Sequence, residues 1–227
     1  MIHLGLFFVL LLAFLDWFAV YNQYERINYI SKPGTLFALI VWFICIGGLQ
    51  GALLWFGVGL VFSLVGDVFL LLPERYFRAG LLVFLLAHIA YIIGFNQPLP
   101  ALGVHFYILA LAIAALGMVM FGIIRAGLQQ HEEGGKMLVP VLVYSITISI
   151  MLFSALLTLF RADWQICASG LAAGGGALFF FSDYLLAYNR FVQPLPHARL
   201  WVRITYHLGQ LGLAAGALYH FVICSSS

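Results

Sequence analysis

The chain has 227 residues, of which 64% are hydrophobic and only 8% are charged, with a formal net charge of +2. A soluble domain carries about 25% charged residues, so this composition cannot cover a water-facing surface and excludes a soluble fold. The net charge is small and the basic residues are dispersed, which argues against a nucleic-acid partner.

Long apolar runs are separated by short breaks that hold most of the prolines and charges. A membrane-spanning helix needs about 20 such residues, and the runs lack the alternation of a transmembrane β-strand. We therefore predict an all-α bundle of eight transmembrane helices in one domain covering 1–227. The first is expected to be a true span rather than a cleaved signal peptide. The predicted spans are residues 2–21, 34–49, 51–72, 78–95, 101–124, 137–160, 165–188 and 199–223.

The cysteines, Cys45, Cys167 and Cys224, stand far apart in apolar stretches. They form no CxxC or Cys/His spacing, so neither a disulfide framework nor a metal site is indicated. We expect them to be small buried hydrophobic residues, and we expect the protein to need no cofactor.

Lysine and arginine gather in the odd-numbered loops and their flanks, whereas the opposite side of the predicted bundle holds only Arg161. Cytoplasmic loops of membrane proteins are enriched in these residues, so the odd loops should face the cytoplasm and both termini the other side. The residues concerned are Arg26, Lys32, Arg75, Arg78, Arg125, Lys136, Arg190, Arg199 and Arg203.

Asp67 and Asp183 are carboxyls inside predicted spans, each six residues before the cytoplasmic end of its segment. That places each about 9 Å inside the helix end, at similar depth on parallel helices. Charged residues are costly in the membrane and mark functional sites by default. Two facing carboxyls repel when both are ionised, so one should keep its proton, as acid/base chemistry requires. The alternative is two separate aspartates, each held by a neighbour such as Lys32 or Arg203.

Further polar residues lie in the same half of the predicted bundle. Asp16 is a candidate third carboxyl, although Trp17 beside it also fits an interfacial position. Lys32 offers a cation, or it extends to the headgroups. The remaining candidates are His88 and Tyr91 one turn apart, Tyr144, Asn189, and a stripe of Arg203, Tyr206, His207 and Gln210.

The other half of the predicted bundle is nearly all apolar. A polar stripe in lipid must face the bundle interior or a cavity. We therefore expect a polar cavity that opens toward the cytoplasmic leaflet. The third and seventh spans also share a small–Asp–x–x–Leu pattern, which raises the hypothesis of a four-plus-four internal repeat.

The sequence resembles the YhhN-like lysoplasmalogenase family of eight-helix membrane hydrolases. The resemblance rests on Lys32-Pro33, the segment FSLVGDVFLLLP, His88 with Tyr91, Pro140 with Tyr144, the segment FSDYLLAYNRF, and the stretch from Tyr206 to Gln210. It implies hydrolysis of the vinyl ether bond of lysoplasmalogens to a fatty aldehyde and glycerophosphoethanolamine or glycerophosphocholine.

The resemblance further implies that Asp67 and Asp183 are the catalytic pair, with no metal. Vinyl ethers hydrolyse by protonation at carbon and capture of water, which an acid and a carboxylate could promote. A single-chain lipid could enter laterally, with its headgroup near Lys32, Arg203 or Arg199. The expected substrate-binding residues are Lys32, His88, Tyr91, Tyr144, Asn189, Arg203, Tyr206, His207 and Gln210.

Two other classes of membrane protein also place carboxyls inside a bundle. A proton-coupled transporter or lipid-binding protein would need a polar pathway to both faces, which the apolar half does not offer. An intramembrane aspartyl protease usually has Gly-x-Gly-Asp, whereas Leu64 occupies the first glycine position here. The short loops favour a bacterial inner membrane over an endoplasmic reticulum, and the sequence does not indicate an oligomeric state.

Overall fold

The computed structural model describes residues 2–130 and 134–223, which form eight α-helices and no strand. The predicted loop at 125–136 falls in part on residues 131–133, and Cys224 also lies outside the described residues. The helices are α1 (Ile2–Tyr21), α2 (Glu25–Ile46), α3 (Ala52–Leu71), α4 (Phe77–Phe95), α5 (Val104–Leu128), α6 (Gly134–Leu157), α7 (Ile166–Phe191) and α8 (Ala198–Leu218).

Within the described residues, seven helices, α1 to α7, are long and apolar enough to cross a membrane, which confirms a multi-pass membrane protein. The remaining helix, α8, has 21 residues but is less apolar. Its polar residues Arg203, His207 and Gln210 are all buried. A helix whose polar face is turned inward can lie in a membrane bundle despite its low hydropathy.

The start of α2 differs from the prediction, because the helix begins at Glu25 rather than at residue 34. Pro33 lies inside the helix instead of opening it. Proline is tolerated inside membrane helices. Lys32 therefore lies on a helix rather than on a loop. Similarly, α5 and α6 extend further into the predicted loop, with Pro140 inside α6.

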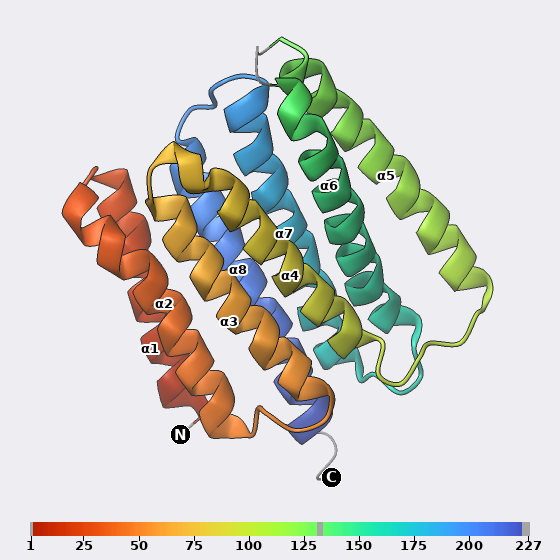
Figure 1. The fold of residues 1–227 in the computed structure, drawn as a ribbon. Helices are drawn as coiled ribbons and strands as arrows, with labels where there is room; N and C mark the ends of the chain where they lie inside the picture. Colours follow the sequence, from red (N-terminus) through yellow and green to blue (C-terminus); the bar gives the residue numbers. More distant parts are fainter. Residues whose placement is uncertain (1, 131–133, 224–227) are drawn as a thin grey trace.

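Consecutive helices pack as antiparallel hairpins, α1 with α2, α3 with α4, α5 with α6 and α7 with α8 (Figure 1). Helix α8 also contacts α1, α2 and α3, whereas α5 lies at the edge of the bundle. Cys45 and Cys167 are free and exposed on the helix surfaces. The expectation that they are buried in the protein is therefore wrong; an apolar run predicts contact with lipid as readily as with the core.

The α7–α8 pair is held at backbone distance by glycines. A Cβ atom on Gly175 would lie 2.5 Å from the Leu213 nitrogen, and one on Gly209 would lie 2.8 Å from the Phe179 nitrogen. Small residues allow membrane helices to approach until their backbones touch. This glycine contact extends along α8 to Gly216, where a Cβ atom would lie 2.7 Å from the Ala172 nitrogen.

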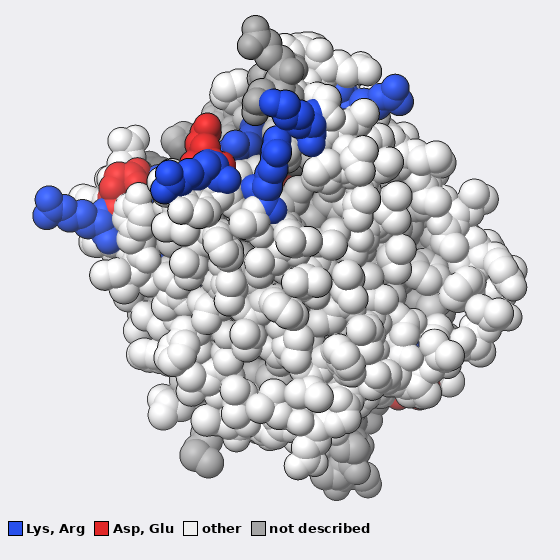
Figure 2. Space-filling model, viewed as in Figure 1, with Lys and Arg blue, Asp and Glu red and all other residues white. Residues whose placement is uncertain are grey.

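Lysine and arginine side chains gather at one end of the molecule, and the broad band below them carries almost no charge on the visible face (Figure 2). We call this the basic end; it carries Arg26, Arg75, Arg78, Arg190 and Arg199. The start of α1 and the end of α8 lie at the opposite end of the bundle (Figure 1).

The basic end is expected to face the cytoplasm, because basic loops are retained there during insertion. The test uses single cysteines in a background without native cysteines. With a membrane-impermeant maleimide on intact cells, Ala101→Cys in the α4–α5 connection should be labelled. Gln193→Cys in the α7–α8 connection should be labelled only after permeabilisation. The reverse pattern would overturn the orientation.

Candidate functional site

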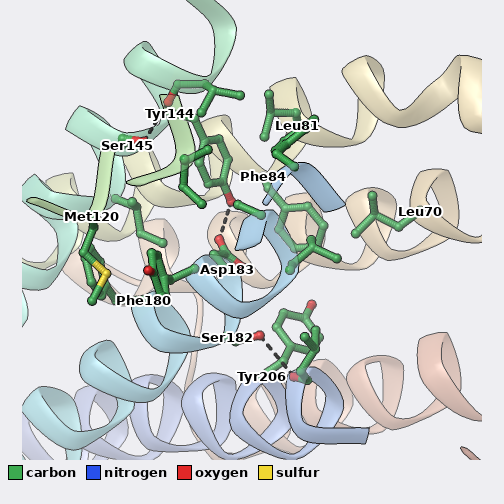
Figure 3. A pocket seen from close by; sticks show the side chains of 18 of the residues that line it. Leu70, Leu81, Phe84, Met120, Tyr144, Ser145, Phe180, Ser182, Asp183 and Tyr206 are labelled. Carbon is green, nitrogen blue, oxygen red and sulfur yellow. Dashed lines mark hydrogen bonds between the residues drawn. The ribbon is translucent and has the colours of Figure 1, made fainter. Parts of the chain in front are cut away.

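A cavity lies between the helices near the basic end, with residues from α2 to α8 in its wall (Figure 3). We call it the central cavity. Most of its lining is apolar, which corrects the expectation of a polar cavity: hydrophobic side chains of α4, α5 and α6 fill the wall between the polar groups. The polar or charged residues that line it are Lys32, Asp67, Tyr144, Ser145, Ser149, Ser182, Asp183, Tyr184, Arg203 and Tyr206.

Asp67 is fully buried on α3, where it meets α2 and α8. Its Oδ1 lies 2.8 Å from the Lys32 ammonium nitrogen, and its Oδ2 accepts a hydrogen bond of 2.9 Å from the Tyr206 hydroxyl. The Lys32 nitrogen is 5.7 Å from the centre of the Tyr206 ring. The Lys32 ammonium and the Tyr206 hydroxyl both interact favourably with the charge of an ionised carboxyl, whereas burial opposes that charge.

Asp183 has a different environment on α7. Its Oδ2 accepts a hydrogen bond from the Tyr144 hydroxyl, and it lies 3.2 Å from the His88 Nε2 atom. His88 is fully buried and its Nε2 atom also lies 3.0 Å from the Tyr144 hydroxyl. In Figure 3 the Tyr144 hydroxyl points toward Asp183 across the cavity. The Asp183 side chain is 13% exposed, against 1% for Asp67, so it is the more accessible carboxyl.

The two aspartates thus line one cavity but have separate partners, and no hydrogen bond or ion pair between them is found among the described residues. The two aspartates were predicted to lie equally far from the ends of their helices, but their distances differ. Helix α3 ends four residues after Asp67, whereas α7 continues for eight residues after Asp183. The difference arises because α7 extends two residues beyond Asn189, while α3 ends two residues before Pro73.

Asp16 forms the second buried ion pair of the bundle. Its carboxylate oxygens lie 2.7 and 2.8 Å from one guanidinium nitrogen of Arg203, and Asp16 is fully buried. The Ser31 hydroxyl donates to the same carboxylate at 2.5 Å. Together with Ser31, this ion pair links α1, α2 and α8. Asp16 is therefore the partner of Arg203 rather than an interfacial residue.

Several predicted site residues lie apart from the cavity lining. The Tyr91 hydroxyl donates to Gln210 at 2.6 Å in the core, and the Trp17 indole donates to His207 at 3.1 Å. Asn189 accepts a hydrogen bond of 2.9 Å from the Leu195 backbone nitrogen, which holds the α7–α8 connection. The stripe on α8 is thus divided. Arg203 and Tyr206 line the central cavity, whereas His207 and Gln210 do not.

Asp16 was predicted only as a candidate third carboxyl, without its partner Arg203, and Ser31 was not predicted as part of the site. A signal for the Asp16 pair was present, because Asp16 and Arg203 are both ionisable residues inside spans and opposite charges are expected to pair there. Ser31 carried no signal that distinguishes it from an ordinary helix residue. Within residues 2–130 and 134–223, no group of three or more His, Cys, Asp or Glu side chains is arranged to hold a metal ion.

Comparisons with known proteins place these residues in context. The family model described as the YhhN family matches residues 27–217. Lysoplasmalogenase TMEM86A of Homo sapiens is 37% identical over 165 residues, which cover 71% of this chain and 64% of that protein. Lysoplasmalogenase TMEM86B of Mus musculus is 35% identical over 216 residues, which cover 91% of this chain and 82% of that protein. No solved structure gives a significant match.

Asp16 and Arg203 should each be required to neutralise the buried charge of the other. Removing one partner of a buried pair leaves an uncompensated charge and costs about 3–5 kcal/mol. Arg203→Met should therefore lower the thermal unfolding temperature of the purified protein sharply. Arg199→Met, which removes an exposed partner of Glu25, should leave it nearly unchanged. The double variant Asp16→Leu with Arg203→Met should recover much of the loss; no recovery would mean that Arg203 acts by packing alone.

Proposed function

Because the chain belongs to the YhhN family, we propose that it is a lysoplasmalogenase, an ether hydrolase that cleaves the vinyl ether bond of lysoplasmalogens. The observation that carries this proposal is the presence of Asp67 and Asp183 in the wall of one largely apolar cavity. The names of the relatives state this activity for those proteins. The products here would be a fatty aldehyde and glycerophosphoethanolamine or glycerophosphocholine.

The substrate is a single-chain lipid, with a polar headgroup and a long apolar chain. A polar groove at the basic end adjoins the central cavity, because Phe77, Leu186 and Phe191 line both. We propose that it receives the phosphate, since arginine and lysine bind phosphate oxygens well. Its polar lining is Glu74, Arg75, Arg78, Lys136, Asn189 and Arg190. This placement differs from the predicted one: Lys32, Arg203 and Arg199 pair with Asp67, Asp16 and Glu25.

We assign the general acid to Asp183. Among the described residues it has no lysine or arginine within ion-pair distance, so no fixed positive charge holds it as a carboxylate. Its Oδ2 already accepts from Tyr144 and faces His88, which leaves Oδ1 to carry a proton toward the cavity. Transfer of that proton to the β-carbon of the vinyl ether gives an oxocarbenium ion. Tyr144 and His88 then stabilise the new Asp183 carboxylate through hydrogen bonds.

Asp67 is assigned the role of the ionised partner, because Lys32 and Tyr206 stabilise its carboxylate. It removes a proton from the water whose oxygen bonds to the oxocarbenium carbon, which gives a hemiacetal. The hemiacetal hydroxyl then returns a proton to Asp183 as the carbon–oxygen bond to glycerol breaks. The glycerol oxygen takes the proton held by Asp67, so both carboxyls regain their starting states and one water is consumed.

Conservative substitution of either aspartate should abolish the reaction. General acid–base catalysis contributes about 100- to 10,000-fold, so Asp67→Asn and Asp183→Asn should each lower aldehyde release from lysoplasmenylethanolamine by at least 100-fold. Asp163→Asn, which changes an aspartate paired with Arg161 in the α6–α7 connection, should retain activity. Full activity in both cavity variants would exclude the pair as catalysts. Lipid binding by the wild-type protein without aldehyde release would indicate a lipid-binding protein.

The route of the proton provides a separate test of the mechanism. In heavy water, acid transfer to the β-carbon should place one deuterium on the carbon next to the aldehyde group. Mass spectrometry of the aldehyde, trapped immediately as a hydrazone, measures this label. An aldehyde without deuterium would contradict protonation at carbon, whichever residue supplies the proton.

A further inference from the structure

A second groove runs between α5 and α6 on the side of the bundle. We call it the lateral groove. Its walls come from these two helices alone, and α5 is the outermost helix of the bundle on this side (Figure 1). The lining residues are Ala110, Ile113, Ala114, Gly117, Met118, Phe121, Leu142, Ser145, Ile146, Ser149, Ile150 and Phe153.

The lateral groove is apolar even at its serines. The Ser145 hydroxyl donates to the Val141 carbonyl oxygen at 2.8 Å, and the Ser149 hydroxyl donates to the Ser145 carbonyl oxygen at 2.7 Å. Both hydroxyl hydrogens are therefore used within α6. A surface of this kind favours contact with hydrocarbon over water.

The lateral groove is continuous with the central cavity, because Gly117, Phe121, Ser145 and Ser149 line both. Gly117 lies at this junction, where an added Cβ atom would stand 2.7 Å from the Ser149 hydroxyl oxygen. A larger residue at 117 would therefore fill the passage between groove and cavity.

Helix α5 is anchored mainly at one end. Of its 25 residues only Ile113, Ile124, Gly127 and Leu128 are buried, and three of these lie in its last five positions. A Cβ atom on Gly127 would lie 2.2 Å from the Phe191 carbonyl oxygen, so α5 touches the backbone of the α7 end there. Away from the basic end, few contacts oppose a separation of α5 from α6, and local openings follow low contact density.

The direction of the lateral groove matches the orientation of a lipid. It begins at the cavity near Phe121 and runs along α5 to Ala110, away from the basic end, over roughly 17 Å at the helical rise. A lipid with its phosphate at the basic end would extend its chain in this direction, toward the middle of the bilayer.

We propose that the lateral groove holds the hydrocarbon chain of the substrate and that lipid enters the cavity from the bilayer between α5 and α6. This inference rests on the proposed function. We infer a hydrocarbon chain as the occupant because the lateral groove is apolar and opens between helices at the edge of the bundle. It reaches the cavity that holds the two carboxyls from the side opposite the polar groove at the basic end.

The test compares Gly117→Leu with Gly122→Leu on the same helix. A Cβ atom on Gly122 would meet nothing within 4 Å, so this matched control adds the same side chain outside the groove. The substrates are a long-chain lysoplasmenylethanolamine and its water-soluble 1-propenyl analogue. In Gly117→Leu, the ratio of kcat/KM for the long over the short substrate should fall at least tenfold, and in Gly122→Leu it should not change.

Ala114→Leu provides a second variant, because Ala114 lines the lateral groove but not the central cavity and is exposed. It should lower the same ratio even if Gly117→Leu fails to fold. An unchanged ratio in the folded groove variants, or an equal loss on both substrates, would overturn the proposal.

Photo-crosslinking separates this inference from the proposed activity. A 1-acyl lysophosphatidylcholine with a diazirine in its chain contains no vinyl ether, so its binding does not depend on hydrolysis. The wild-type protein in detergent should give adducts within 110–121 and 142–153, and Ala114→Leu should reduce them. Adducts confined to other helices would overturn the groove assignment. Adducts here without aldehyde release from either substrate would instead contradict only the hydrolase.

Discussion

Two ion pairs buried among the helices determine where the other polar groups lie. Lys32 pairs with Asp67 and Arg203 pairs with Asp16, so each buried cation has its own carboxylate. Isolated charges in a membrane interior are costly, and pairing removes most of that cost. Within the described part of the chain, the partly exposed Asp183 has no Lys or Arg partner; its partners are the Tyr144 phenol and the His88 imidazole. In the proposed mechanism Asp183 is the general acid, and its transfer of a proton to the substrate would place a new carboxylate beside a new cation.

The sequence predicted the features that depend on hydropathy and on charge counts. Apolar runs of about 20 residues set the number of helices, and the position of the loop charges set the basic end. The predicted start of α2 is wrong because proline often marks a helix boundary, whereas a membrane helix tolerates Pro33 in its interior. The four-plus-four repeat and the orientation in the membrane stay predictions.

The partners of the polar residues were less predictable. A sequence gives the depth and face of each side chain on its own helix, but not which helices are neighbours. Arg203 lines the central cavity beside Tyr206, as their shared stripe indicates, but its ion-pair partner Asp16 is 187 residues away in the chain. Tyr91 and Gln210 are predicted near the site, but in the structure the Tyr91 hydroxyl donates to the Gln210 carbonyl oxygen in the core. Asp67 and Asp183 both line the central cavity, and their role as a catalytic pair stays a prediction.

The backbone contact between α7 and α8 has a mechanical consequence. Because glycines bring the two main chains together, no layer of flexible side chains separates them. Asp183 on α7 is therefore carried on the same stiff unit as Tyr206 and Arg203 on α8, which hold the carboxyls of α3 and α1. The relative position of the two helices is set by direct backbone contact rather than by the rotamers of side chains between them. Motion of α5, which is anchored mainly at one end, should then leave the positions of Asp183, Arg203 and Tyr206 relative to one another little changed.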